Sequence, residues 1–200
     1  MGNIEKFDAI ANCYDTYERL QTTKIIVEKI KKYIGNKKNS VAMDFGCGTG
    51  LIGMQLIDNF SSMIFIDASY SMIEQVNEKI RENKISSAKT ICYNFEEHED
   101  INIKSDYIII VQTLLHIKDI ELILSRLFKI LNNNGHLIIV DFNKNDFITS
   151  NEVHNGFDQN ELGKILKNIG YDDVKSETFY FGENIFMGND ASLFILDCKK

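Results

Sequence analysis

The most informative stretch of this sequence reads Met43-Asp44-Phe45-Gly46-Cys47-Gly48-Thr49-Gly50-Leu51. It lies where an apolar strand should turn into a helix, and its glycines follow the pattern Gly-x-Gly-x-Gly. Glycines let the backbone turn tightly and approach a ligand, because no Cβ stands in the way. The helix that we expect next would offer unpaired N–H groups to a carboxylate or phosphate. The stretch therefore predicts a ligand site, with a glycine-rich turn that binds nothing as the alternative.

Strand-like and helical patterns alternate on both sides of this loop. Short apolar runs suit strands that are buried on both faces, and they lie at residues 41–45, 63–66, 89–93, 107–111 and 136–140. Between them, an apolar helical stripe at 72–80 follows Ser69 as an N-cap, and a second stripe covers 120–131. This alternation predicts a three-layer, Rossmann-like α/β sandwich with a mostly parallel sheet.

The alternation of strand-like and helical patterns stops after the run at 136–140. Residues 143–157 are polar and aperiodic, and Asp158 and Glu161 then mark the start of a helix. Strands at 174–181 and 192–198 follow and can pair antiparallel. We therefore expect a sheet of seven strands with the last one antiparallel, preceded by an N-terminal helical extension.

Composition and charge exclude several classes of protein. A net charge of −7 disfavours broad attraction to nucleic acids or anionic lipids, so we expect no nucleic-acid partner. The apolar runs are far shorter than the ~20 residues that span a bilayer, and residues 1–6 lack the pattern of a secretory signal. The 4 cysteines are far apart and form no Cys-x-x-Cys pair, which argues against zinc or a disulfide framework. We expect a cytoplasmic protein with no membrane partner.

A dinucleotide is the competing ligand for the glycine loop. The segment from Gly48 to Gly53 also matches the fingerprint Gly-x-Gly-x-x-Gly. That motif begins directly at the end of the strand, where this chain has Gly46, and in that register Leu51 occupies the third glycine position. The register therefore disfavours a nicotinamide dinucleotide.

The loop and its preceding acid resemble the first motif of the class I S-adenosylmethionine (SAM) dependent methyltransferases, acid-x-Gly-x-Gly-x-Gly. The match extends to Asp67-Ala68-Ser69-Tyr70-Ser71-Met72, which is similar to the Asp-x-Ser-x-x-Met segment of that family. A carboxylate at this strand end can accept both ribose hydroxyls, and Met72 can lie against adenine. An acid that interacts with a helix dipole is the structural alternative for Asp67. The resemblance implies that SAM is the cofactor, that S-adenosylhomocysteine is its product, and that these residues bind it: Asp44, Gly46, Cys47, Gly48, Gly50, Asp67, Ala68 and Met72.

Weaker matches follow the next two strands. In Tyr93-Asn94-Phe95-Glu96, Asn94 replaces the acid that usually accepts from the adenine amino group, and Phe95 can supply a backbone N–H. An Asx turn beside a packed aromatic ring explains the same residues equally well. Gln112 begins a segment that looks like the fourth motif of the family, and the resemblance places it near the methionine end of SAM.

Three residues are candidate catalytic groups. Tyr14 stands in Phe7-Asp8-x-x-Ala11-x-x-Tyr14-Asp15, which resembles the lid of small-molecule methyltransferases, although helical packing explains the spacing equally well. His154 lies in the 143–157 loop, where such enzymes select their substrates; an exposed loop histidine is the alternative. For His116 we favour a structural imidazole over a catalytic base. We therefore expect His154 to face the acceptor and His116 to pack internally.

The resemblance covers nearly the whole chain and implies methyl transfer to a small-molecule acceptor by in-line displacement. Several subclasses are disfavoured, because the chain has no proline for the motifs of the adenine, glutamine-amide or cytosine enzymes. Gln112 stands where the metal-dependent catechol enzymes need an acid, so we predict no metal. Two alternatives stay open: an NAD(P)-dependent oxidoreductase, for which Tyr171-x-x-x-Lys175 spells a short-chain dehydrogenase pair, and a SAM-binding module without turnover.

The length of 200 residues indicates one domain over 1–200. Within it we expect a helical N-terminal cap at 1–38, a SAM-binding half at 39–142, and a substrate-side loop with the C-terminal strands at 143–200.

Overall fold

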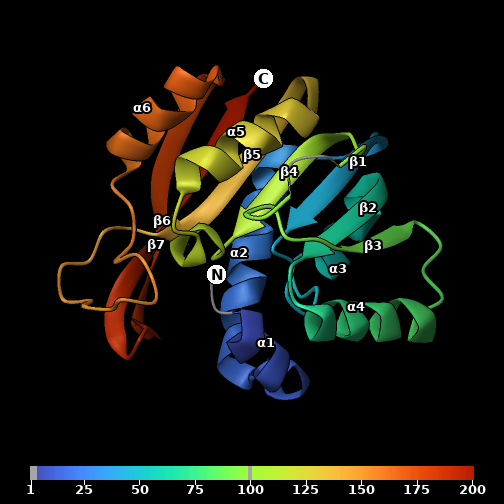
Figure 1. The fold of residues 1–200 in the computed structure, drawn as a ribbon, viewed down its shortest axis with the longest axis horizontal. Helices are drawn as coiled ribbons and strands as arrows, with labels where there is room; N and C mark the ends of the chain where they lie inside the picture. Colours follow the sequence, from blue (N-terminus) through green and yellow to red (C-terminus); the bar gives the residue numbers. More distant parts are fainter. Residues whose placement is uncertain (1–3, 99–100) are drawn as a thin grey trace.

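One seven-stranded sheet runs through the computed structural model, which describes residues 4–98 and 101–200. Its strand order is β3-β2-β1-β4-β5-β7-β6 (Figure 1). Strands β1 to β5 pair in parallel, whereas β7 lies antiparallel between β5 and β6. The prediction of seven strands with the last one antiparallel is confirmed. The strands are β1 (Lys37–Phe45), β2 (Phe60–Asp67), β3 (Ala88–Cys92), β4 (Ser105–Val111), β5 (Leu131–Phe142), β6 (Asp172–Phe186) and β7 (Asn189–Lys199).

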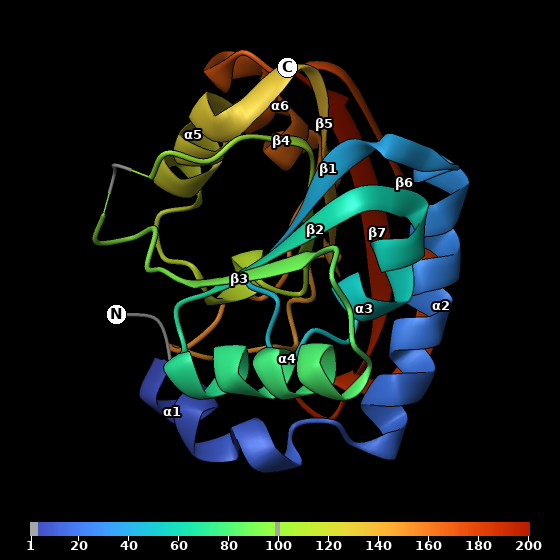
Figure 2. The same cartoon turned by 90° about the vertical axis from the view of Figure 1, so that its right-hand side faces the viewer.

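Helices cover both faces of this sheet. Figure 2 shows α5 and α6 on one side and α2 and α3 on the other, so the predicted three-layer sandwich is confirmed. The N-terminal extension is helical too, and α1 lies beside α4. The helices are α1 (Ile4–Ile10), α2 (Tyr17–Ile34), α3 (Gly53–Leu56), α4 (Tyr70–Glu82), α5 (Ile120–Ile130) and α6 (Gln159–Ile169), with 3-10 turns η1 (Ala11–Cys13), η2 (Ile57–Asn59) and η3 (Leu114–His116).

Local sequence signals explain where most helices begin and end. Ser69 caps α4 by accepting from the Met72 N–H at 3.1 Å, as predicted. Asp158 caps α6 in the same way, and Gly170 ends it with φ +119°, a conformation that suits glycine. Helix α2 begins at Tyr17, within the predicted helical cap, because Thr16 provides an N-cap that the apolar periodicity does not reveal.

The helix that we expected after the glycine loop is present and very short. Helix α3 has 4 residues and continues directly into the turn η2. It packs closely on the sheet, since a Cβ at Gly53 would lie 2.4 Å from the ring of Phe65. A single helical turn has little macrodipole, so the argument that a helix N-terminus binds an anion here loses its basis.

The apolar strands form the centre of one core cluster that extends over both faces of the sheet. The segments 108–110, 137–140 and 193–196 are fully buried, as their continuous hydrophobicity predicts. None of the helices within residues 4–98 and 101–200 is both long and apolar enough to cross a membrane. The division of the chain at residues 38 and 142 stays a prediction, and the first residues of the 1–6 segment lie outside the described residues.

The strand order reverses at the centre of the sheet. The chain runs outward from β1 through β2 to β3 and then returns to place β4 on the other side of β1. In open α/β sheets, ligands bind at the carboxyl ends of the strands at this point of reversal. The glycine loop directly follows β1, so the fold places it at that point.

Candidate functional site

The glycine loop has a backbone that requires its glycines. Gly46, Gly48 and Gly50 have φ values of +66°, +53° and +82°, which are left-handed and strained for other residues. The N–H groups of Gly46 and Cys47 both donate to the Ile66 carbonyl, at 2.8 and 3.0 Å. These bonds fix the loop to the end of β2.

Thr113 explains why the first glycine cannot carry a side chain. A Cβ at Gly46 would lie 2.2 Å from Cγ2 of Thr113, and the Thr113 hydroxyl donates to the Gly46 carbonyl at 3.2 Å. Thr113 follows β4, so it joins the loop to the neighbouring strand. Sequence reasoning missed this residue, because a lone threonine carries no motif signal.

Asp67 at the end of β2 faces the same loop. One carboxylate oxygen accepts from Gly48 N at 2.8 Å, and the other accepts from Ser69 N at 2.9 Å. Burial raises its pKa, whereas these two hydrogen bonds act in the opposite direction. Each oxygen retains a second lone pair, so the carboxylate can both fix the loop and accept hydroxyls from a ligand.

Asp44, near the end of β1, stabilises the glycine loop through a hydrogen bond to the start of α3. Its side chain is buried, and one carboxylate oxygen accepts from Gly53 N at 2.9 Å. Burial raises the Asp44 pKa to about 7. The acid of the first motif therefore positions the turn between β1 and α3.

One cavity of about 620 Å³ lies at the carboxyl ends of the parallel strands. Gly50 does not line it; a Cβ there would lie 3.2 Å from Val76, so this glycine faces the core. The other predicted cofactor residues all line the cavity: Asp44, Gly46, Cys47, Gly48, Asp67, Ala68, Met72, Asn94, Phe95 and Gln112.

The segment after β3 adopts the structural alternative that we considered. Asn94 accepts from Glu96 N at 3.0 Å through its side-chain oxygen, which is an Asx turn. Phe95 is buried edge-on against Phe45 and Tyr93, with ring centroids 5.1 and 4.9 Å apart. The Asn94 oxygen that could replace the missing acid therefore already accepts one backbone hydrogen bond and retains one lone pair.

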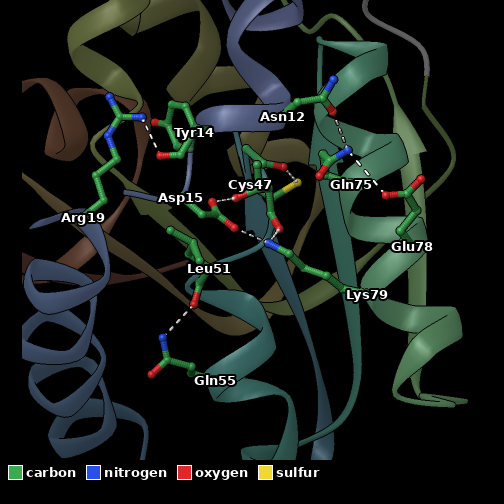
Figure 3. A network of polar contacts seen from close by, with 12 residues as sticks. Asn12, Tyr14, Asp15, Arg19, Cys47, Leu51, Gln55, Gln75, Glu78 and Lys79 are labelled. Atoms are coloured by element: carbon green, nitrogen blue, oxygen red, sulfur yellow. Dashed lines mark hydrogen bonds and ion pairs between the residues drawn. The ribbon is translucent and has the colours of Figure 1, made fainter. Parts of the chain in front are cut away.

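The chain segment 4–16, called here the strap, closes over this cavity from the N-terminal side. Asp8 accepts from the Ser69 hydroxyl at 2.6 Å and from Ser71 N at 3.0 Å, and these bonds lower its pKa. Asp15 accepts from the Thr49 hydroxyl and pairs with Lys79 at 2.7 Å (Figure 3). The strap is thus tied to both the glycine loop and α4. No sequence motif had indicated these contacts.

Tyr14 lies on the strap and lines the cavity. The Arg19 guanidinium lies 3.8 Å above its ring and donates to the Tyr14 carbonyl at 3.2 Å (Figure 3). A Cβ at Gly48 would lie 3.7 Å from this ring, so Tyr14 stands beside the glycine loop. Burial raises the Tyr14 pKa, which disfavours a role as a base.

His116, at the end of η3, lines the cavity and meets the Phe7 ring edge-on at 5.1 Å. Its Nδ1 is buried without a hydrogen-bond partner within residues 4–98 and 101–200. Burial first, and then Lys6 and Arg19, lower its pKa to about 4, so the imidazole is neutral at physiological pH.

His154 does not lie at this cavity. Its Nε2–H donates to the Ile117 carbonyl at 2.7 Å, and its backbone N–H donates to Leu115 at 2.8 Å. It lines a separate pocket formed by the 148–155 segment. The expectation that His154 faces the acceptor while His116 packs internally does not match this placement, because the loop folds back and uses the His154 ring to hold the turn around η3.

The dehydrogenase-like pair is also separated. The Tyr171 hydroxyl is buried and donates to the Leu124 carbonyl at 3.1 Å, whereas Lys175 lies on β6 and pairs with Asp173 at 2.8 Å. Neither residue lines the cavity.

A family model described as "Methyltransferase domain" matches residues 36–180. This chain belongs to that family. The methyltransferase domain shares its fold with solved methyltransferases. Phosphoethanolamine N-methyltransferase 2 of Haemonchus contortus, in complex with phosphomonomethylethanolamine and S-adenosylhomocysteine, has a TM-score of 0.72 and 15% identity. A SAM dependent methyltransferase from Aquifex aeolicus has a TM-score of 0.68 and 18% identity, and the match covers 96% of this chain and 97% of that one. At such identities the similarity shows the fold.

Sequence relatives point to the same family. An uncharacterized methyltransferase of Schizosaccharomyces pombe is 28% identical over 205 residues, which cover 82% of this chain and 71% of that protein. Malonyl-[acyl-carrier protein] O-methyltransferase 1 of Ilyobacter polytropus is 24% identical over 74% of this chain. The methyltransferase domain spans about half of the Ilyobacter and Haemonchus proteins, 54% and 52%, and the Haemonchus match covers 92% of this chain. None of these relatives is an oxidoreductase.

Proposed function

We propose that this methyltransferase domain transfers a methyl group from SAM to a small-molecule acceptor. The observation that carries the proposal is the position of the Asp67 carboxylate, which lines the 620 Å³ cavity beside three left-handed glycines at the reversal point of the sheet. A nucleoside needs such a carboxylate for its ribose hydroxyls. Relatives of the family that bind or act on small molecules, such as the phosphoethanolamine enzymes, support the acceptor class.

The residues that would hold the donor come from four strand ends. Asp67 accepts hydroxyls, Met72 and Phe95 supply apolar contacts for a base, and Gln112 and Thr113 line the cavity beside the glycine loop. When bound, SAM supplies a methyl group that is activated by its positive sulfonium. The protein needs no covalent nucleophile; it holds donor and acceptor together and excludes water, and such positioning can supply ~7 to 11 kcal/mol.

His116 replaces His154 as the proposed group on the acceptor side. A neutral imidazole that lines the cavity can accept a hydrogen bond from the acceptor and orient it. Tyr14 contacts the same Phe7 ring as His116, and it stands beside the glycine loop with Arg19 over its ring.

Product formation tests the proposal. The protein is incubated with SAM labelled on the methyl carbon and with a panel of small amines and alcohols, and both S-adenosylhomocysteine and labelled acceptor are measured. We expect the two products in equal amounts. Binding of SAM with neither product would instead support the module without turnover.

The site also bears on partners, metal and location. No three His, Cys, Asp or Glu side chains within the described ranges are grouped to hold a metal ion, and independence from metal stays a prediction. The 4 cysteines are free thiols. We place the protein in the cytoplasm, where thiols stay reduced, and we propose no nucleic-acid partner.

A further inference from the structure

The cavity continues beyond the donor side into a second half with a stacked aromatic pair in its wall. This acceptor half lies between the strap, the first turns of α2, the end of β5 and the tip of the β6–β7 hairpin. Phe142 at the end of β5 stacks on Phe186 of the hairpin, with ring centroids 4.2 Å apart. Phe7 and Val153 add apolar surface from the strap and the 143–157 loop. The Phe142–Phe186 stack gives this half an apolar wall, whereas the first turns of α2 add polar side chains: Glu18, Arg19, Thr22 and Thr23.

The charges around the cavity are strongly one-sided. Arg19 is the one permanently basic side chain among the described residues that line it, and five carboxylates line it as well: Glu18, Asp44, Asp67, Glu96 and Glu183. Arg19 is engaged by the Tyr14 ring and carbonyl next to the glycine loop. The cavity therefore offers a phosphate or carboxylate a single guanidinium that is already engaged, against five carboxyl groups.

Glu183 is the carboxylate best placed to act on an acceptor. It lies near the tip of the hairpin, three residues before Phe186, and it takes part in no hydrogen bond or ion pair within the described part of the chain. Glu18, in contrast, bonds to the N-terminal turn of its own helix, which lowers its pKa. Glu183 is exposed and lines the same cavity as the stacked rings, and such a combination attracts a cation with an apolar body.

We propose that the acceptor is an apolar amine without a phosphate or carboxylate group, and that Glu183 binds its ammonium form. This inference rests on the proposed function and names its substrate class. After the ammonium loses one proton to solvent, the amine nitrogen attacks the methyl carbon with its lone pair. The carbon–sulfur bond breaks with its electrons left on sulfur, and the product is the methylated ammonium with neutral S-adenosylhomocysteine. The proposed acceptor therefore differs from the phosphoethanolamine and malonyl groups for which relatives are named.

Three probes of matched size test the proposal at pH 7.5: 3-phenylpropylamine, 3-phenylpropanol and 3-phenylpropionate. Calorimetry first measures S-adenosylhomocysteine binding, and each probe is then titrated into the saturated protein. We expect the amine to bind at least 10-fold more tightly than the propionate and about 3- to 10-fold more tightly than the alcohol. Glu183→Gln should remove the preference for amine over alcohol and leave alcohol binding unchanged. Glu82→Gln, an exposed site on α4 that loses the same charge, is the control.

Each other result overturns the proposal. If the propionate binds as tightly as the amine, or if the alcohol matches the amine, the cavity does not select cations. If Glu183→Gln and Glu82→Gln behave alike, Glu183 is not the binding group. An amine that fails to bind at millimolar concentration also contradicts the proposal. When S-adenosylhomocysteine binds in these experiments, the failure concerns only the acceptor; when it does not, the proposed function fails as well.

Discussion

Asp67 holds the glycine loop and lines the cavity at the same time. The Asp67→Ala variant should therefore weaken S-adenosylhomocysteine binding by about 1.5 to 3 kcal/mol, and the loss of two backbone hydrogen bonds should also lower the melting temperature. Asp67→Asn keeps one acceptor oxygen, so its effect on affinity should be smaller. Calorimetry and thermal unfolding measure both effects. Unchanged affinity in Asp67→Ala would leave this residue with only its structural role.

The two histidines give opposite expectations. His116→Leu removes an imidazole whose Nδ1 has no hydrogen-bond partner in the described ranges, so stability should change little. Turnover should fall by about 10²- to 10⁴-fold if the ring orients the acceptor. His154→Ala loses the bond to the Ile117 carbonyl and should cost about 1 kcal/mol of stability with most turnover retained. If His154→Ala abolishes turnover while His116→Leu retains it, His154 and not His116 acts on the acceptor.

At the scale of elements, the strap depends on a small polar contact between Asp15, Thr49 and Lys79. Lys79 donates to the Asp15 carboxylate and to the Thr49 carbonyl, both at 2.7 Å. Because the strap covers the donor side, Asp15→Ala should speed dissociation of S-adenosylhomocysteine by about 3- to 30-fold, which corresponds to the loss of one or two hydrogen bonds. Surface plasmon resonance measures this rate. Asp58→Ala, an exposed acid on η2, should leave it unchanged. Equal rates in both variants would show that the strap does not retain the ligand.

Sequence reasoning predicted the elements whose local signals are strong. The buried strands follow from continuous apolar runs, and the starts of α4 and α6 follow from Ser69 and Asp158. The sequence indicated a helix after the glycine loop but not its length, because no local stop signal marks the change from α3 to η2. The hairpin of β6 and β7 is longer than predicted, since its tip turns at Met187 and Gly188, both with φ > 0, without an apolar pattern.

The difference between local signals and contacts across the fold also explains which residues of the candidate site the sequence indicated. Asp44, Asp67 and the glycines belong to motifs, so their spacing alone was enough to indicate them. Thr113 and Asp15 act through contacts with segments that are far apart in the sequence, so even the lid pattern that contains Asp15 did not indicate its partners. Glu183 lines the cavity from the distant hairpin and belongs to no motif. The placement of the two histidines differs from the expectation for the same reason, because only the folded loop shows that His154 bonds to Ile117.

For the whole molecule, two buried acids predict how stability depends on pH. Burial raises the pKa of Asp44 and of Asp141 to about 7. Between their unfolded and folded pKa values the native state binds more protons than the unfolded state, so the free energy of unfolding should fall as pH rises from about 4 to about 7. The pKa of His116 is lowered from 6.5 to about 4. Between these two pH values this histidine makes the free energy of unfolding rise with pH, which offsets part of the fall caused by the two acids. Urea denaturation at several pH values measures the curve.

Asp141→Asn provides the matched comparison for this curve. Asp141 accepts from the N–H groups of Leu115 and Phe142, and an amide retains only one acceptor oxygen, so the variant should be less stable at low pH. Its stability should also fall less steeply with pH than that of the unchanged protein, because one of the two titrating acids is gone. Parallel curves for the two proteins would show that Asp141 does not titrate in this range.

The central claim is that the cavity beside Asp67 binds the SAM nucleoside, and a calorimetric titration tests it most directly. S-adenosylhomocysteine and NADH are titrated separately into the full chain under the same conditions. The account predicts saturable binding of one S-adenosylhomocysteine per chain and no comparable heat from NADH, because Leu51 occupies the third glycine position of the dinucleotide motif. Tight binding of NADH without binding of S-adenosylhomocysteine would contradict it.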